Sequence, residues 1–185
     1  MDHIDPFWRC ARRTNFSTSV RILFLKSRQS QKNGMSHRFA RRLLKEHQAF
    51  ERANLPGLQL LPGSDITKYL VSMSVANELY SGQKFMLLIS IGTEYPVEPP
   101  LVKFVTENEC TVPLHPHVYS NGHICLNVLG KDWTPACGVE SVVLSVQSML
   151  STNTLAERPP DDARYVRHAP RDPKNGRFVY HDDTV

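Results

Sequence analysis

The segment HPHVYSNGHICLNVLG, residues 115–130, combines three histidines and a cysteine with turn-forming and aliphatic residues. The residues YSNG are typical of a turn, and the apolar run ICLNVL follows almost at once, so Cys125 lies where an exposed loop meets a packed segment. A nucleophile suits this position, because one side of the residue is anchored and the other is open to a substrate. A buried thiol that acts as a small hydrophobe fits the same pattern.

A zinc site is a third interpretation of this segment. His115, His117, His123 and Cys125 are all residue types that bind zinc, in the spacing H-x-H-x5-H-x-C. The segment has no CxxC pair, and Pro116 stiffens the first pair of histidines. Structural zinc sites rarely take all four ligands from so short a stretch. A zinc-binding module therefore stays a minor alternative, and we expect no metal.

Alternating apolar residues upstream predict an antiparallel sheet. Residues 71–75 and 85–91 both have the two-residue period of a strand, so they predict a hairpin. The turn YPVEPP leads into a third strand, LVKFV at 101–105, while LPGLQLLPGSD at 55–65 predicts turns that follow a helix. We expect three or four strands in one meander.

Two amphipathic helices flank these strands. The first begins at the N-cap Ser36, and the apolar stripe of the second falls on valines in residues 139–150. The stripe of the first helix consists of Phe39, Leu43, Phe50 and Ala53. The order of helix, meander, long irregular segment, helix and tail predicts an α+β domain.

The basic charge of the chain lies at its N-terminal end. Residues 1–34 carry seven basic and two acidic side chains, whereas the remainder carries 15 basic and 16 acidic ones. The nearly neutral folded part argues against a nucleic-acid-binding domain. No apolar run approaches the roughly 20 residues that cross a bilayer, so we expect no membrane partner.

The two ends of the chain differ from its core. We predict that residues 1–34 form a disordered basic extension, dispensable for function, which is either a presequence or an extension of the gene model. Asp2 and Asp5 weaken a mitochondrial presequence. The polar tail 156–185 contains four prolines, which predict irregular structure and an open site. The four cysteines form no CxxC pair, which predicts free thiols.

Several motifs together resemble the ubiquitin-conjugating enzyme family. The active-site segment of this family contains His-Pro-Asn, an Asn-Gly turn and Ile-Cys-Leu, followed by Trp-Ser/Thr-Pro-Ala. This chain is similar, with HPHVYSNGHICLNVL, then WTPA at 133–136 and a valine-rich helix. YPVEPPLVKF and RRLLKE resemble two further family segments. The resemblance runs from Met35 to Arg158 and implies the family's UBC fold for the core 35–185.

Three features are similar to the W-type members of the family in particular. These members have His-Pro-His in place of His-Pro-Asn, as residues 115–117 do here. The stretch RPPDDARYVR at 158–167 and the ending YHDDT at 180–184 are also similar. The W-type resemblance implies monoubiquitination of the α-amino group at flexible substrate N-termini.

The resemblance implies a mechanism for the site. Cys125 accepts the C-terminal glycine of ubiquitin as a thioester and passes it to an amine. His117 takes the place of the family asparagine that stabilises the thioester oxygen, and imidazole both donates hydrogen bonds and ionises near neutral pH. The resemblance places Asn121, Asp161 and Asp162 at the mouth of the site. We expect His115 to be structural, packing on Trp133 or capping backbone, and His123 to be an incidental loop residue.

The resemblance also implies partners. Activating enzyme would bind the basic face of the first helix, and RING or U-box ligases would bind two loops. The residues concerned are Arg38, Arg41, Arg42 and Lys45 for the activating enzyme, and Val97, Pro135 and Ala136 for the ligase. We expect no cofactor, because ATP is used by the activating enzyme, and a location in cytoplasm and nucleus. An inactive ubiquitin-binding scaffold is the alternative.

Overall fold

The computed structural model describes residues 38–107, 110–176 and 178. The predicted basic extension 1–34, the start of the family resemblance at Met35 and the ending YHDDT lie outside the described residues. The prediction of Ser36 as the N-cap of the first helix was wrong, because the N-cap residue of this helix is Phe39. The first described helix, α3, spans Ala40–Arg52 and buries Leu43 and Phe50, two members of the predicted apolar stripe.

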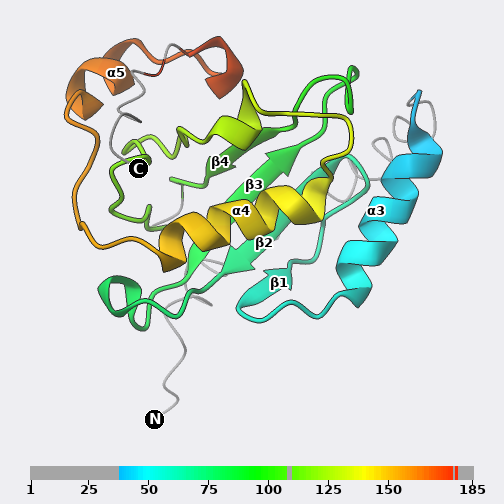
Figure 1. Cartoon of the computed structure of the whole chain (residues 1–185), viewed down its shortest axis with the longest axis horizontal. Coiled ribbons are helices and arrows are strands. Elements are labelled where there is room, and N and C mark those ends of the chain that lie inside the picture. The colour runs from blue at the N-terminus through cyan, green and yellow to red at the C-terminus, as the bar shows by residue number, and fades with distance from the viewer. Residues whose placement is uncertain (1–37, 108–109, 177, 179–185) are drawn as a thin grey trace.

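Four strands form one antiparallel sheet in the order β1-β2-β3-β4 (Figure 1). The strands are β1 (Leu58–Leu60), β2 (Lys68–Met73), β3 (Phe85–Ser90) and β4 (Leu101–Phe104). The predicted hairpin is confirmed, since Val71 pairs with Leu87, and so is the third predicted strand, which is β4.

The turns predicted within residues 55–65 are present at both Pro-Gly pairs, but the residues between them form a strand that the sequence did not single out. Between their two Pro-Gly pairs lies β1, in which Leu58 pairs with Met73 of β2. A strand of three residues is too short to show a two-residue period, so the proline and glycine signals dominated the prediction. Gly57, with φ +73°, allows the chain to turn into this strand.

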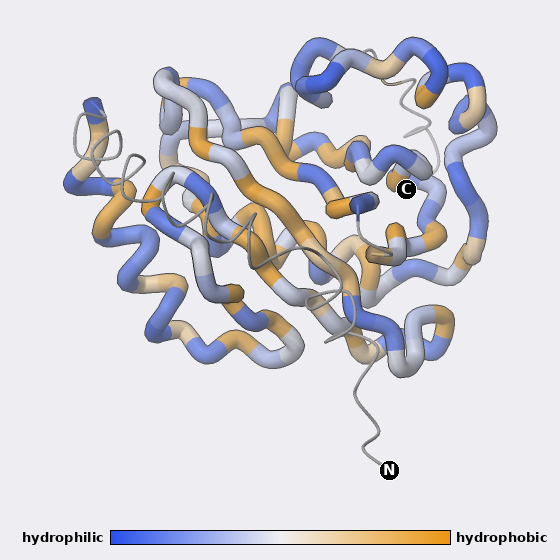
Figure 2. The backbone as a smooth tube through the Cα atoms, turned by 180° about the vertical axis from the view of Figure 1, so that it is seen from behind, coloured by the Kyte–Doolittle hydropathy of each residue, from blue (hydrophilic) through white to orange (hydrophobic). Residues whose placement is uncertain are grey.

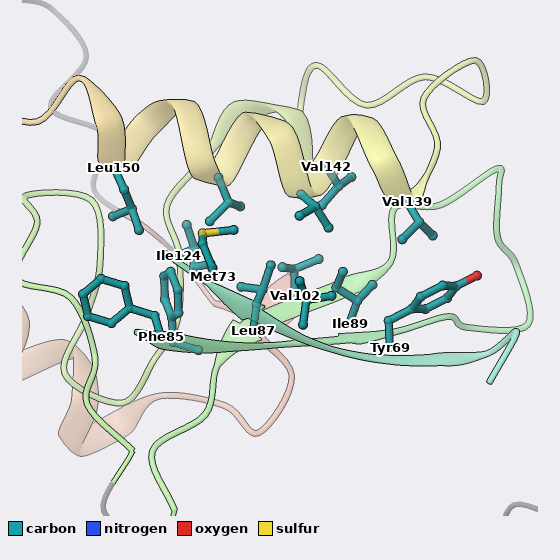
Figure 3. Close-up of a cluster of buried hydrophobic side chains, with 14 of the residues drawn as sticks. Tyr69, Met73, Phe85, Leu87, Ile89, Val102, Ile124, Val139, Val142 and Leu150 are labelled. Atoms are coloured by element: carbon teal, nitrogen blue, oxygen red, sulfur yellow. The ribbon is translucent and has the colours of Figure 1, made fainter. Parts of the chain in front are cut away.

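The valine-rich helix α4, Val139–Ser151, lies across one face of the sheet (Figure 1). Its apolar side chains point toward those of the strands, as Figure 3 shows for Val142 above Val102. This interface is the main core of the protein. Its buried residues from the helix are Val139, Val142, Val143, Val146 and Leu150. Viewed from behind, the strands are mostly hydrophobic and α3 alternates between hydrophobic and hydrophilic residues (Figure 2).

The α+β order of elements predicted from the sequence is confirmed, with one addition in the tail. Residues Asp162–His168 form a short helix, α5, where irregular structure was expected. Three 3-10 turns complete the described elements, at Glu78–Tyr80, Asn127–Leu129 and Pro173–Asn175. None of the described helices has the length and apolar character that crossing a membrane requires.

The prediction of free thiols holds for two of the cysteines. Cys125 and Cys137 are free thiols. Cys110 is disulfide-bonded, so the prediction was wrong for this residue. Cysteine spacing in the sequence did not reveal this bond, because a disulfide depends on which segments the fold brings together.

Candidate active site

A groove of about 890 Å³ contains the thiol singled out from the sequence. One wall comes from the segment of His117 and Cys125, and the other comes from residues 152–160, which follow α4. The structure therefore brings together the two residues predicted to carry the chemistry, and adds a wall from the tail.

Cys125 and His117 face each other across a narrow hairpin. The backbone N–H of Cys125 donates to the carbonyl of His117 at 2.8 Å, and Val118 forms a bridge with Ile124. Because this hydrogen bond fixes the two backbones, their side chains enter the groove from adjacent positions. Cys125 is 5% exposed, which leaves its thiol at the floor of the groove.

The tip of this hairpin is anchored to the sheet. Gly122 has φ +85°, and its carbonyl accepts a hydrogen bond from the N–H of Phe104 at 2.8 Å. A Cβ at position 122 would collide with the carbonyl oxygen of Phe104 at the end of β4. Glycine is therefore required here both by conformation and by space.

His115 caps backbone, which is one of the two structural roles predicted for it. Its Nδ1 accepts a hydrogen bond from the N–H of His117 at 2.9 Å, and its side chain is buried. Burial and, to a smaller extent, the charge of His117 together lower its pKa to about 4, against the opposing effect of a hydrogen bond with the backbone of Met149. Trp133, the other predicted contact, packs on Tyr95 instead.

His123 is a buried anchoring residue, so its interpretation as an incidental loop residue was wrong. Its Nδ1 shares a hydrogen bond of 2.9 Å with the hydroxyl of Tyr165 in α5. Burial lowers its pKa, the positive charge of Lys103 acts in the same direction, and Asp172 opposes them. The contact with Tyr165 comes from a helix that the sequence analysis did not predict.

Two of the three residues predicted at the mouth of the site hold the hairpin to the start of α5. Asp161 accepts from the hydroxyl of Tyr119 at 3.1 Å, and Asp162 accepts from the N–H of Ser120 at 2.7 Å. Asn121 accepts from the N–H of His123 at 3.1 Å. The described lining of the groove includes none of these three side chains.

Other polar residues line the groove, and the sequence analysis missed them. They are Asn127 and Lys131, which follow Cys125, and Asn153 and Glu157, which follow α4. In the sequence, only proximity to Cys125 distinguishes Asn127 and Lys131 as site residues. Nothing in the sequence distinguishes Asn153 and Glu157. Glu157 is exposed and brings a carboxylate to the groove.

The candidate zinc ligands are not arranged for a metal. Within residues 38–107, 110–176 and 178, no group of three or more histidine, cysteine or acidic side chains is placed to hold an ion. The Nδ1 atoms of His115 and His123 are engaged in hydrogen bonds with a backbone N–H and a tyrosine hydroxyl. The structure thus gives no support to a zinc-binding module.

The predicted ligase loops lie side by side. Val97 is 64% exposed, and Pro135 and Ala136 are exposed as well. The indole N–H of Trp133 donates to the carbonyl of Pro96 at 2.9 Å and joins the two loops. A single continuous surface results.

The basic residues of α3 divide into two groups. Arg38, Arg41 and Lys45 are exposed. Arg42 instead contacts its own protein: it pairs with Glu46 at 2.6 Å and donates to the carbonyl of Cys137 at 2.8 Å. The first three side chains form a surface that a partner can reach, whereas Arg42 braces α3 against the start of α4.

Comparisons with known proteins agree with this geometry. The family model described as "Ubiquitin-conjugating enzyme" matches residues 42–175. A relative from Danio rerio, "Probable ubiquitin-conjugating enzyme E2 W-A", is 45% identical over 148 residues, 78% of this chain and 96% of the relative. "Ubiquitin-conjugating enzyme E2 W" from Caenorhabditis elegans is 43% identical over 155 residues, 82% of this chain and 100% of the relative.

A solved structure is similar over the same core. The ubiquitin-conjugating enzyme E2 UbcA1 from Agrocybe aegerita superposes with a TM-score of 0.71 at 41% sequence identity, over 75% of this chain and 100% of that one.

Proposed function

The chain belongs to the ubiquitin-conjugating enzyme family, as a W-type member, and from that premise we propose that Cys125 carries ubiquitin as a thioester and transfers it to the α-amino group of flexible protein N-termini. The observation that carries this proposal is the backbone hydrogen bond between Cys125 and His117, which holds both side chains in one groove.

Two exchanges at Cys125 make up the proposed reaction. Its thiolate attacks the thioester of the charged activating enzyme, so a new C–S bond forms, the old one breaks and the activating enzyme recovers its thiol. A neutral amine then attacks the same carbonyl carbon, a C–N bond forms, the C–S bond breaks and one amine proton leaves to solvent. A thiolate is a good leaving group in this second step.

His117 supports the second step. Negative charge develops on the thioester oxygen as the amine adds, and a hydrogen-bond donor held in position lowers the barrier. The position of His117 in the groove with Cys125 suits this role, because an imidazole N–H donates as an asparagine amide does.

The preference for α-amines follows from proton chemistry. With ordinary pKa values of about 7.8 for an α-amine and about 10.4 for lysine, roughly a third of the former and about a thousandth of the latter is neutral at pH 7.4. A site for lysine needs help to remove that proton. Here Asp161 and Asp162, the carboxylates expected at the mouth, are hydrogen bonded to the hairpin and lie outside the described lining of the groove. Glu157 is the one carboxylate of that described lining, and it is exposed on the wall that follows α4, so we assign it no part in removing the amine proton.

The family implies ubiquitin, an activating enzyme and ligases as partners. We propose that the activating enzyme contacts Arg38, Arg41 and Lys45, and that RING or U-box ligases contact Val97, Pro135 and Ala136. The protein itself needs no cofactor in this scheme. We further propose a location in cytoplasm and nucleus, which imaging of the tagged full chain tests.

A charging reaction tests the central proposal. The full chain is incubated with activating enzyme, ATP and ubiquitin, and the products are separated without reducing agent. We expect an adduct that thiols cleave and that Cys125→Ala abolishes, while Cys137→Ala, a second free thiol, still forms it. An adduct that persists in Cys125→Ala would refute the assignment.

A pair of peptides tests the acceptor. One has a free N-terminus and no lysine, and the other is N-acetylated and contains one lysine. We expect the first to be modified at least about a hundredfold faster at pH 7.4, from the neutral fractions above. Equal rates would contradict the α-amine preference.

A further inference from the structure

An unsatisfied polar atom lies in the wall of the groove, two residues after the thiol. The side-chain oxygen Oδ1 of Asn127 is buried and has no hydrogen-bond partner among the residues that the structure describes. The two other such atoms belong to His47 and Tyr69, whose rings contact each other between α3 and β2. Asn127 alone of these three lines the groove that contains Cys125.

The backbone of Asn127, in contrast, is firmly held. Its carbonyl accepts hydrogen bonds from the N–H of Gly130 at 2.9 Å and of Asp132 at 3.1 Å, in the 3-10 turn that begins at Asn127. The fold thus fixes the backbone position of Asn127, but among the described residues it provides no hydrogen-bond donor for the side-chain oxygen. Because a buried acceptor without a donor costs free energy, a rotation that turns the oxygen into the groove toward a donor is favoured.

A hydrogen-bond acceptor without a partner is satisfied by a ligand that carries a hydrogen-bond donor. Of the groups that the proposed reaction brings to Cys125, the attacking amine has N–H bonds to donate. We propose that Asn127 is a further catalytic residue, whose Oδ1 accepts a hydrogen bond from the incoming α-amine and directs its lone pair at the thioester carbonyl carbon. This inference rests on the proposed function, which it extends to the acceptor.

The neutrality of the carboxamide matters for this role. A carboxylate in the same place would stabilise the ammonium form of the amine and raise its pKa, which lowers the fraction able to attack. A carboxamide orients the neutral amine without that penalty. Asn127 therefore fits an acceptor that arrives deprotonated.

The test uses the full-length protein, charged with ubiquitin and freed of activating enzyme. The thioester is discharged either to the lysine-free peptide with a free N-terminus or to 2-mercaptoethanesulfonate, whose thiolate has no hydrogen to donate. For Asn127→Ala we expect discharge to the peptide to fall about tenfold and discharge to the thiolate to stay unchanged. Asn175→Ala, an exposed asparagine outside the groove, is the matched control for the substitution.

Two further readouts separate this role from a structural one. Asn127→Ala removes the orphaned oxygen, so its melting temperature should equal or exceed that of the wild type. Asn127→Asp should move the pH at which peptide discharge is half-maximal upward. Equal slowing of both discharge reactions by Asn127→Ala, or no slowing of either, overturns the proposal. Failure of the wild type to form a thioester would instead refute the proposed function.

Discussion

The rings of Tyr119 and Tyr165 lie 4.0 Å apart between centroids and are inclined by 34°. Tyr119 belongs to the hairpin that carries Cys125, and Tyr165 belongs to α5. Both pack with Cys125 in a small apolar cluster that is separate from the main core. A part of the chain that looked irregular in the sequence thus supports the floor of the groove.

Tyr165→Ala should destabilise this cluster. Loss of a buried aromatic side chain is expected to lower the free energy of unfolding by about 3 kcal/mol. Tyr165→Phe keeps the stacking and loses only the hydrogen bond to His123, so we expect a loss of about 1 kcal/mol. Urea denaturation measures both. If Phe proves as harmful as Ala, the hydrogen bond and not the ring holds α5.

Gly122→Ala should disrupt the tip of the active-site hairpin. The added methyl group meets the carbonyl of Phe104 and the residue must keep φ +85°, so a loss of at least about 2 kcal/mol is expected. Gly82→Ala is the control, since position 82 has φ +70° but open space around it. Thermal unfolding of the two variants separates the collision from the conformational strain. Similar losses would show that the contact with Phe104 relaxes.

Stability should fall as the pH is lowered from 7 to 4, in part through His115. Its pKa is about 4 in the folded protein, below the ordinary 6.5, so the unfolded chain binds the proton more tightly. The stabilisation is complete above pH 6.5 and is lost between pH 6.5 and 4. At pH 5 the loss amounts to about 2 kcal/mol.

The check is chemical denaturation of wild type and His115→Asn from pH 7.5 to 4.5. The variant should lose that part of the acid dependence. Some dependence should remain, because the pKa of His123 is lowered too. A variant with an unchanged pH profile would show that His115 does not control it.

Arg41 and Arg42, neighbours in the chain, should behave differently. Arg41→Ala removes an exposed charge, so we expect slower charging by the activating enzyme with unchanged stability. Arg42→Ala leaves the carbonyl of Cys137 without its side-chain partner and removes the ion pair with Glu46, which keeps its hydrogen bonds from Tyr95 and Val139, so it should lower the free energy of unfolding by about 1–2 kcal/mol. Initial charging rates and melting curves measure the two effects. Loss of stability in Arg41→Ala would argue against this division.

How well the sequence predicted each element depended on the length of its pattern. The valines of α4 and the alternation around Val71 and Leu87 extend over enough residues to display a period, and those predictions are confirmed. Strand β1 and helix α5 are short and stand next to prolines, so local signals gave the wrong result. Both form because the rest of the fold supplies partners, such as Met73 for Leu58.

The sequence predicted the two central residues of the candidate site and missed the residues around them. Cys125 and His117 lie within one short motif, and a hairpin brings them together. The role of His123 depends on a partner distant in sequence, and the role proposed for Asn127 depends on the burial of its side-chain oxygen, neither of which a pattern of residue types reveals. For His123 the partner is Tyr165, 42 residues away.

The attachment of α5 to the hairpin has a consequence for the newly made chain. A chain emerging from the ribosome contains Cys125 well before Asp161, Asp162 and Tyr165, which hold the hairpin from the other side. The thiol is therefore synthesised early and its surroundings are completed late, after a long loop has closed. Nascent chains released before residue 165 would present the thiol without this support, so the site is completed only after α5 has been synthesised.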